Sequence, residues 1–454
     1  MSGVNTMAAI DLRSRSGGAT RRAAWVAFAA VVVLSPFRAS IGVIRDLGGS
    51  AYPEPAWSLL AVVVTLGLWV LSLAAMPRRV VVGPSFIALP VAGLLAVAWL
   101  GLVVSVDPAV TAKEALGLTL VIALGLYIIN EIDSVEQVAL PVMAMIAIQV
   151  VVALGQVAAQ RSIGLAFLGE QTLVPADGRI SVIAAADGTF TLRGYGLADH
   201  PNILGGILAF ALITLGGARR LSERWSAARW IILAAGFAAL FLTYSRAAWI
   251  AYAVGVAVGL VMFARMRDRS SVRRWLAAAG LAVVVAAPLV IATVPSVAAR
   301  LNAAGPIPAE SRSVDERLAL AEGAIALFLE RPALGIGFGT LPTTMAVSQP
   351  GFDSRQPAHL VLLDAAAETG IVGAACYLAL SLAPWVALMR MRRRRWTPDL
   401  VAASAAVAAV TAVGLFDHYT WTTPAGLIWV ALAVGLWVVA YRSAVERPDG
   451  GGVA

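Results

Sequence analysis

The chain has 454 residues, of which 60% are hydrophobic and only 13% are charged. A composition this apolar excludes a soluble domain with an ordinary polar surface. The formal charge of +8 does not indicate a nucleic-acid partner, because the basic residues gather in short runs between apolar stretches, where they mark membrane topology.

Residues 1–22 are polar and lack a small-residue cleavage pattern, so we expect a cytoplasmic N-terminal tail and an uncleaved first helix. The apolar runs that follow predict an all-α polytopic membrane protein, with about twelve transmembrane helices in a single domain over residues 23–441. Residues 442–454 form a second predicted tail. The predicted spans are residues 23–44, 56–76, 84–105, 112–130, 137–159, 201–217, 228–243, 246–264, 274–294, 366–389, 399–416 and 421–441.

The basic residues fall in alternate loops, and this alternation sets the orientation. Positive charge accumulates on the cytoplasmic side, so both termini are expected in the cytoplasm and the protein in the plasma (inner) membrane. The acidic loop at 131–136 gives this orientation no support. The basic positions are Arg13, Arg15, Arg21, Arg22, Arg78, Arg79, the runs at 219–229, 265–274 and 390–395, and Arg442.

Two connections, at about residues 160–200 and 295–365, are too long for simple turns, and both fall on the outer side. Loops of this length are usually functional or disordered. The second contains the capping box Ser313–Glu316, followed by Leu318, Ala321, Ile325 and Phe328 at helical spacing. We therefore predict an amphipathic helix that starts there and lies on the outer membrane interface.

The three histidines, His200, His359 and His418, all lie in or beside outer loops. No H-x-H, H-x-x-x-H or D-x-D spacing accompanies them, which disfavours a metal site. The single cysteine, Cys376, excludes an intramolecular disulfide and is expected to be a packing residue.

The segment Thr191–Gly206 runs from the first long loop into the sixth predicted span. Arg193, His200 and Asn202 are candidate binding residues here. The alternative is that Asp199 or Asn202 caps the helix and Arg193 contacts a lipid headgroup.

The next candidate is the tight turn Leu242–Arg246, which contains Tyr244. Arg246 faces the outer surface, either at a binding site or as a snorkelling anchor.

Arg317 lies on the predicted outer helix and either binds a ligand or pairs with Asp315 or Glu316. It precedes a segment, Glu330–Gly339, with glycines at every second position near its end. These glycines resemble a phosphate-binding loop, but no strand precedes them, and a flexible turn is the favoured interpretation.

His359 stands where the chain returns to the membrane, with Glu368 following in the next span. A histidine at this position can act as a general base toward a hydroxyl, or it can be a hydrogen-bonded structural residue. Glu368 is expected to satisfy nearby backbone or Thr369. Asp417 and His418, at the last outer turn, are interpreted as mostly structural.

Taken in order, these segments resemble the membrane O-antigen ligase and polymerase superfamily. The family pattern is R-x-x-G with HPN, a T-Y-S-R turn, an arginine-bearing outer helix before P-x-x-G-x-G, and H-N with E-x-G. The resemblance covers roughly residues 185–375, and it departs at Leu360, where the family usually has asparagine.

The resemblance implies transfer of a glycan from an undecaprenyl diphosphate carrier to an acceptor hydroxyl at the outer face. The implied enzyme is a metal-independent inverting glycosyltransferase of the GT-C type, without a cofactor. His359 would be the catalytic base. The implied diphosphate or donor ligands are Arg193, Arg246, Arg317 and His200, with Tyr244, Asn202 and Glu368 in support.

The partners implied are the carrier-linked donor, membrane lipids and a glycan, lipid or protein acceptor. An O-antigen ligase is the first interpretation, an O-antigen or exopolysaccharide polymerase is the second, and a protein oligosaccharyltransferase is a third. A transporter or flippase for lipid-linked glycan is the alternative of another class, but transporters place polar groups near the bilayer midplane, whereas the polar groups here gather at outer ends. A purely structural membrane scaffold is the remaining alternative.

Overall fold

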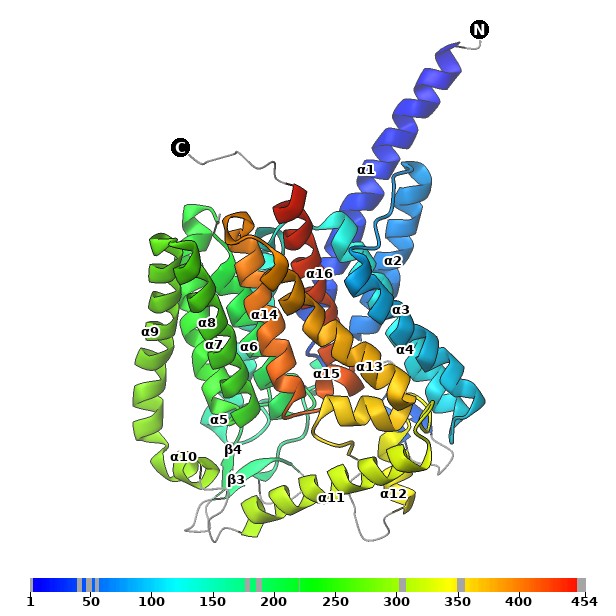
Figure 1. Cartoon of the computed structure of the whole chain (residues 1–454). Helices are drawn as coiled ribbons and strands as arrows, with labels where there is room; N and C mark the ends of the chain where they lie inside the picture. The colour runs from blue at the N-terminus through cyan, green and yellow to red at the C-terminus, as the bar shows by residue number, and fades with distance from the viewer. Residues whose placement is uncertain are drawn as a thin grey trace.

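The computed structural model describes residues 3–38, 43–45, 51–53, 57–175, 180–184, 190–219, 221–301, 308–348 and 356–446. Its long helices form one bundle, and short helices and strands gather at the end opposite the chain termini (Figure 1). The long helices of the bundle are α1 (Gly3–Leu34), α2 (Trp57–Ala75), α3 (Ser85–Leu100), α4 (Pro108–Glu131), α5 (Val135–Ala159), α6 (Pro201–Gly217), α7 (Glu223–Leu242), α8 (Arg246–Met266), α9 (Arg269–Ala292), α13 (Val361–Arg390), α14 (Pro398–Gly414) and α16 (Pro424–Glu446).

Within the described residues, nine helices are long and apolar enough to cross a membrane. This confirms the prediction of an all-α polytopic membrane protein. Helices α6 and α14 are apolar but shorter, so the count of about twelve spans stays a prediction. The first helix differs from its prediction, since it already begins at Gly3 and ends at Leu34. It stops early because Pro36 disfavours helical backbone at the residue before it.

The short elements connect the long helices, mostly at the far end of the bundle (Figure 1). Each pair of strands forms an antiparallel hairpin. The short elements are β1 (Val43–Arg45), β2 (Ala51–Pro53), β3 (Val182–Ala184), β4 (Phe190–Leu192), α10 (Val294–Leu301), α11 (Pro308–Glu330), α12 (Leu341–Ser348), α15 (Tyr419–Thr422) and the 3-10 turns Gly101–Val103, Ala166–Leu168 and Arg393–Arg395.

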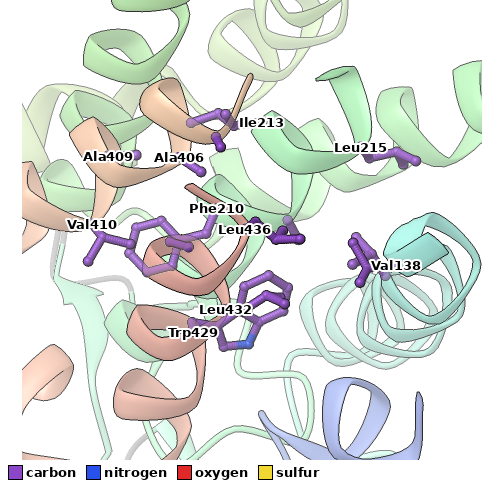
Figure 2. Packing of buried hydrophobic residues seen from close by; sticks show 14 of the residues in the cluster. Val138, Phe210, Ile213, Leu215, Ala406, Ala409, Val410, Trp429, Leu432 and Leu436 are labelled. Atoms are coloured by element: carbon purple, nitrogen blue, oxygen red, sulfur yellow. The ribbon is translucent and has the colours of Figure 1, made fainter. Parts of the chain in front are cut away.

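Helices α6, α14 and α16 form the centre of the bundle. Every residue of α6 except Gly216 is buried, and side chains such as Phe210, Val410 and Trp429 interlock between the three helices (Figure 2). Helix α14 is rich in alanine, which lets neighbouring backbones approach closely. Because the surrounding helices shield α6 from lipid, it can be shorter than a lipid-facing span.

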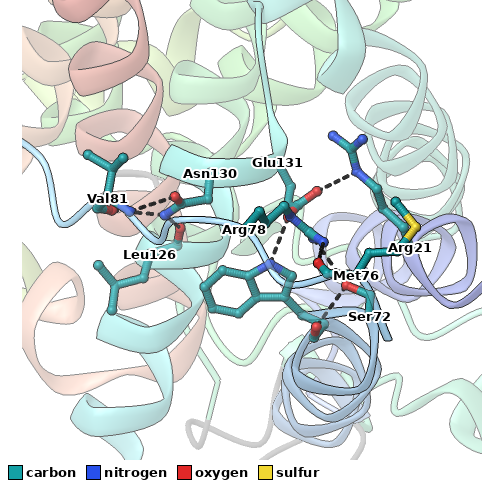
Figure 3. Close-up of polar contacts among 9 residues, drawn as sticks. Arg21, Ser72, Met76, Arg78, Val81, Leu126, Asn130 and Glu131 are labelled. Carbon is teal, nitrogen blue, oxygen red and sulfur yellow. Dashed lines mark hydrogen bonds and ion pairs between the residues drawn. The ribbon is translucent and has the colours of Figure 1, made fainter. Parts of the chain in front are cut away.

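Glu131, the first residue of the acidic loop that did not fit the charge pattern, is neutralised at the end of the bundle that carries the termini. The buried carboxylate of Glu131 accepts hydrogen bonds from Arg21 Nε at 2.6 Å and from Trp69 Nε1 at 2.8 Å, and it also pairs with Arg78 (Figure 3). This cluster joins α1, α2 and α4. Glu131 therefore contributes a structural ion pair, which explains why its charge opposes the sequence pattern.

The helix predicted in the second long loop exists, but its predicted start is wrong. Helix α11 begins at Pro308, so the box at Ser313 lies inside it and does not cap it. One face, with Leu320 and Leu327, packs in a buried cluster, whereas Leu318 and Ile325 remain exposed. The exposed apolar side fits a position on a membrane interface, which stays a prediction.

Candidate functional site

A cluster of two histidines and one carboxylate lies where α13 and α15 begin. Asp417 Oδ1 is 3.5 Å from His359 Nδ1 and 3.8 Å from His418 Nε2. The two imidazole rings meet edge to face with centroids 5.2 Å apart. His418 Nδ1 is held by the Thr422 hydroxyl at 2.7 Å. The structure therefore brings together residues that stand 58 positions apart in the sequence, from Asp417 to His359.

Asp417 also connects this cluster to the first candidate segment. Its Oδ2 accepts a hydrogen bond from Asn202 Nδ2 at 2.8 Å, and Asn202 Oδ1 accepts one from Arg193 Nη2 at 2.6 Å. The buried side chains of Arg193, Asn202 and Asp417 thus form a chain that ends at the half-buried His359. Asn202 is oriented by both neighbours, and this fixes which way its amide faces.

Arg193 is the most enclosed of the candidate arginines, with 2% of its surface exposed. Its Nε donates to the Thr243 carbonyl at 2.7 Å, and its Nη1 donates to Ser181 Oγ at 2.5 Å. The guanidinium therefore ties the β3–β4 hairpin, the start of α6 and the α7–α8 turn together. These bonds favour a positioning role for Arg193, and direct contact with a donor stays a prediction.

Glycines at the start of α6 allow these elements to meet. A Cβ on Gly205 would lie 2.8 Å from Thr243 Oγ1, and a Cβ on Gly206 would overlap the Tyr419 ring. Real Cβ atoms do not approach other atoms so closely. The two glycines therefore let α6 touch both the α7–α8 turn and α15, which begins directly after His418.

The other two arginines lie on neighbouring elements. Arg246 is the first residue of α8, directly after the turn that accepts the bond from Arg193. Arg317, half-buried on α11, is close enough for its positive charge to lower the pKa of His418. Tyr244 in the turn is completely buried and packs against Phe241 and Trp249, which indicates a structural role.

Charge and burial set the protonation of the cluster. Burial lowers the pKa of His418 to about 4 and that of His200 to about 3, and the charge of Arg193 adds to the effect on His200. Burial alone would raise the pKa of Asp417, but the neighbouring imidazoles of His359 and His418 hold it well below its usual value. At neutral pH the site therefore contains an ionised carboxylate beside two neutral histidines, His200 and His418.

The glycine-rich segment is a turn, as favoured from the sequence, and its backbone pairs with α13. Helix α13 breaks at Gly370, where φ is +66°, and the backbone N–H groups of Ile336 and Gly337 bond to carbonyls freed at the break. Gly335 and Gly337 themselves have positive φ, and a Cβ on Gly335 would meet the Glu368 backbone. These glycines serve backbone pairing, so the phosphate-binding alternative gains no support.

Glu368 connects this glycine-rich turn to the histidine cluster. Its carboxylate accepts hydrogen bonds from the Leu341 N–H at 3.2 Å and from Trp421 Nε1 at 2.8 Å. Trp421 lies in α15, one helical turn after His418. The supporting role predicted for Glu368 therefore has a clear geometric basis.

A cleft of about 510 Å³ adjoins the cluster through Thr422. It is lined by the pairs Arg38–Asp199 and Lys113–Glu114, whose closest atoms are 2.7 and 3.4 Å apart. Leucines of α2 and α4 form its apolar wall. A cleft with polar groups at one end and leucines along a membrane helix suits a substrate with a charged head and a lipid tail.

Asp417 is the residue that sequence reasoning missed. It was interpreted as mostly structural because no motif spacing joins it to His359, whereas the fold places it at the centre of the cluster. The same three residues, His359, Asp417 and His418, have donor atoms within 4.8 Å of one another and could hold a metal ion. Residue spacing could not show this site, because the ligands come from different elements.

These features define a polytopic membrane protein with a buried arginine, carboxylate and histidine cluster at one end of its helix bundle. Residues 231–378 match the family model described as O-antigen ligase, and this match supports assignment of the chain to the O-antigen ligase and polymerase superfamily. The matched segment includes Arg246, Arg317 and His359 but ends before Asp417. No curated protein matches the chain.

Proposed function

We propose that this protein transfers a glycan from an undecaprenyl diphosphate carrier to an acceptor hydroxyl at the outer face of the membrane, as an O-antigen ligase does. The observation that carries the proposal is the contact between His359 and Asp417, linked through Asn202 to Arg193. This cluster lies at the end of the bundle that the charge pattern predicts to face outward. A polymerase of the same superfamily would use the same chemistry with another carrier-linked glycan as acceptor.

His359 is the proposed general base. Its Nδ1 faces Asp417, so Nε2 is the nitrogen left to receive a proton. The acceptor oxygen attacks the anomeric carbon, the bond from that carbon to the diphosphate oxygen breaks, and the hydroxyl proton passes to Nε2. Asp417 then stabilises the imidazolium that forms, as a carboxylate does in hydrolase triads. One displacement of this kind inverts the configuration at the anomeric carbon.

The leaving diphosphate gains negative charge as the bond breaks, and cationic side chains can stabilise it without a metal ion. Arg317 is the first candidate, because its charge already acts on His418 in the cluster. Arg246 is the second, because it begins α8, where the helix dipole adds positive potential. The carrier chain would lie along the apolar wall of the adjoining cleft.

The test is turnover by the purified full-length protein in detergent, with a carrier-linked glycan and candidate acceptors. We expect release of carrier diphosphate to fall by about 10²–10⁴-fold in His359→Gln, the usual contribution of a general base. His418→Gln is the matched control, and it should lose less because Asp417 and Thr422 already hold it.

The same turnover assay with an added chelator tests metal independence, because the histidine cluster could hold an ion. Turnover that survives chelation supports the proposed mechanism. Activity that disappears and returns with added zinc or another divalent ion would show a metal centre and remove His359 as the base. Transport of intact lipid-linked glycan in vesicles, without release of diphosphate, would replace the enzyme with a transporter.

A further inference from the structure

A second polar feature lies at the opposite end of the bundle from the histidines, where α13 ends. The turn between α13 and α14 carries a run of arginines from Arg390 to Arg395, interrupted only by Met391. The charge pattern predicts that this end faces the cytoplasm. Among the described residues, neither Arg390 nor Arg392 forms an ion pair, and both are exposed.

An apolar cleft of about 820 Å³ opens directly beside this turn, between α3, α13 and α16. Ala379, Leu382 and Val386 of α13 form one wall, and Tyr441 and Val445 of α16 form another. Its described lining residues include three arginines, Arg390, Arg392 and Arg395, and no acidic side chain.

Aromatic packing fixes the wall of the cleft that α16 and α3 form. Tyr441 stacks on Trp437 with ring centroids 4.9 Å apart, and Phe86 packs edge to face on Tyr441 at 5.4 Å. Trp437 is itself fixed by a hydrogen bond to Ser404 Oγ at 3.1 Å. Aromatic side chains such as Tyr441 are typical of the headgroup level of a membrane. An occupant of this cleft would therefore have its apolar part against α13 and its polar part at the arginines.

We propose that this cleft binds an anionic glycerophospholipid of the inner leaflet, with its phosphate on Arg390 and Arg392 and an acyl chain against the α13 wall. Positive charge at one end and apolar walls below it complement a lipid with a negative headgroup, and basic pockets between membrane helices are known to bind such headgroups. The cleft volume falls within the range of about 300–1,000 Å³ typical of ligand sites. The proposal is independent of the glycan chemistry at the other end.

The experiment is native mass spectrometry of the delipidated full-length protein with phosphatidylglycerol or phosphatidylcholine of the same acyl chains. We expect selective retention of phosphatidylglycerol. Because each surface cation contributes about 1 kcal/mol to anionic lipid binding, Arg390→Gln with Arg392→Gln should weaken its affinity by about 10- to 30-fold. Arg79→Gln with Arg394→Gln removes the same charge from the same bundle end, outside the cleft, and should have little effect.

A second pair of variants tests the apolar wall without changing charge. Ala379→Trp fills the cleft at an exposed wall position and should also reduce retention, whereas Leu378→Trp, at an exposed neighbour outside the cleft, should not. Equal binding of the two lipids by the native protein would overturn the proposal. Equal losses in the cleft and control variants would also overturn it, as would displacement of the lipid by soluble glycerol phosphate at comparable concentration.

Discussion

Asp417 is the residue on which the most contacts of the site converge. Its two carboxylate oxygens are shared among His359, His418 and Asn202. Its pKa is held below the usual value, so the carboxylate stays charged at neutral pH and orients the histidine beside it. The sequence around Asp417 does not reveal this role, because one of its partners, Asn202, lies more than 200 residues earlier in the chain.

We therefore predict that Asp417→Asn reduces turnover by at least about tenfold while leaving the protein folded. Replacing the carboxylate removes the charge that stabilises an imidazolium at His359 and permits the wrong tautomer. The measurement is carrier diphosphate release across a pH series, together with Tm in detergent. A purely structural role for Asp417 would lower Tm and turnover together without changing the pH profile. That result would contradict the proposed orientation of His359.

The depressed histidine pKa values predict acid sensitivity. His200 and His418 have folded-state pKa values of about 3 and 4, well below the usual 6.5. Between pH 6.5 and about 4 these two histidines bind protons in the unfolded chain but not in the folded chain, so their contribution lowers the stability as the pH decreases through this window. The slope is about 1.4 kcal/mol per pH unit for each histidine.

The check is Tm in a nonionic detergent at pH 7.0 and pH 5.0, comparing the native protein with the double variant His200→Asn, His418→Asn. We expect the Tm of the native protein to fall more between pH 7.0 and pH 5.0 than the Tm of the variant. Equal changes in the two Tm values would show that the two histidines are not held neutral. The charges of Arg193 and Arg317 contribute to this effect.

Among the helices, α6 depends most on close approach. Gly206→Ala places a methyl group against the hydroxyl and ring of Tyr419, which is buried. We expect a loss of about 1–3 kcal/mol of stability, the usual cost of overpacking, and a larger loss of turnover because His418 is the N-cap of α15.

Gly216→Ala in the same helix provides the control. No atom lies within 4 Å of the position that the new methyl group would take, so this change should be neutral or slightly stabilising through helix propensity. Tm and turnover of both variants are measured together, and Tyr419→Phe combined with Gly206→Ala should recover part of the loss. Equal behaviour of the two alanine variants would refute the close contact between α6 and α15.

Apolar runs were enough to locate the helices, because lipid requires each spanning segment to form its own backbone hydrogen bonds. The sequence pattern also placed a helix around Arg317. It misplaced that helix's start, because a capping box also occurs inside helices, and it did not show that the turn from Gly335 to Gly339 pairs with α13. The pairing of that segment with α13 depends on a break at Gly370 that no periodicity reveals.

At the scale of the whole molecule, the main polar clusters lie at the two ends of the bundle. The Glu131 cluster, the termini and the arginine turn lie at one end, and the histidine cluster lies at the other (Figure 1). This separation fits a protein that takes a lipid-linked donor from the outer leaflet while basic residues fix its orientation from inside. It also makes the orientation of the chain a direct condition for the proposed function.

Orientation can be measured with a single thiol, because Cys376 is the only cysteine. In a Cys376→Ala background, Ala326→Cys on α11 and Ser270→Cys at the start of α9 introduce small, exposed labels at opposite ends of the bundle. We expect a membrane-impermeant maleimide to label residue 326 in intact cells and residue 270 only after permeabilisation, because the charge pattern predicts that the arginine-rich loops face the cytoplasm. The reverse pattern would place His359 on the cytoplasmic side, where an outer-face glycan transfer could not occur.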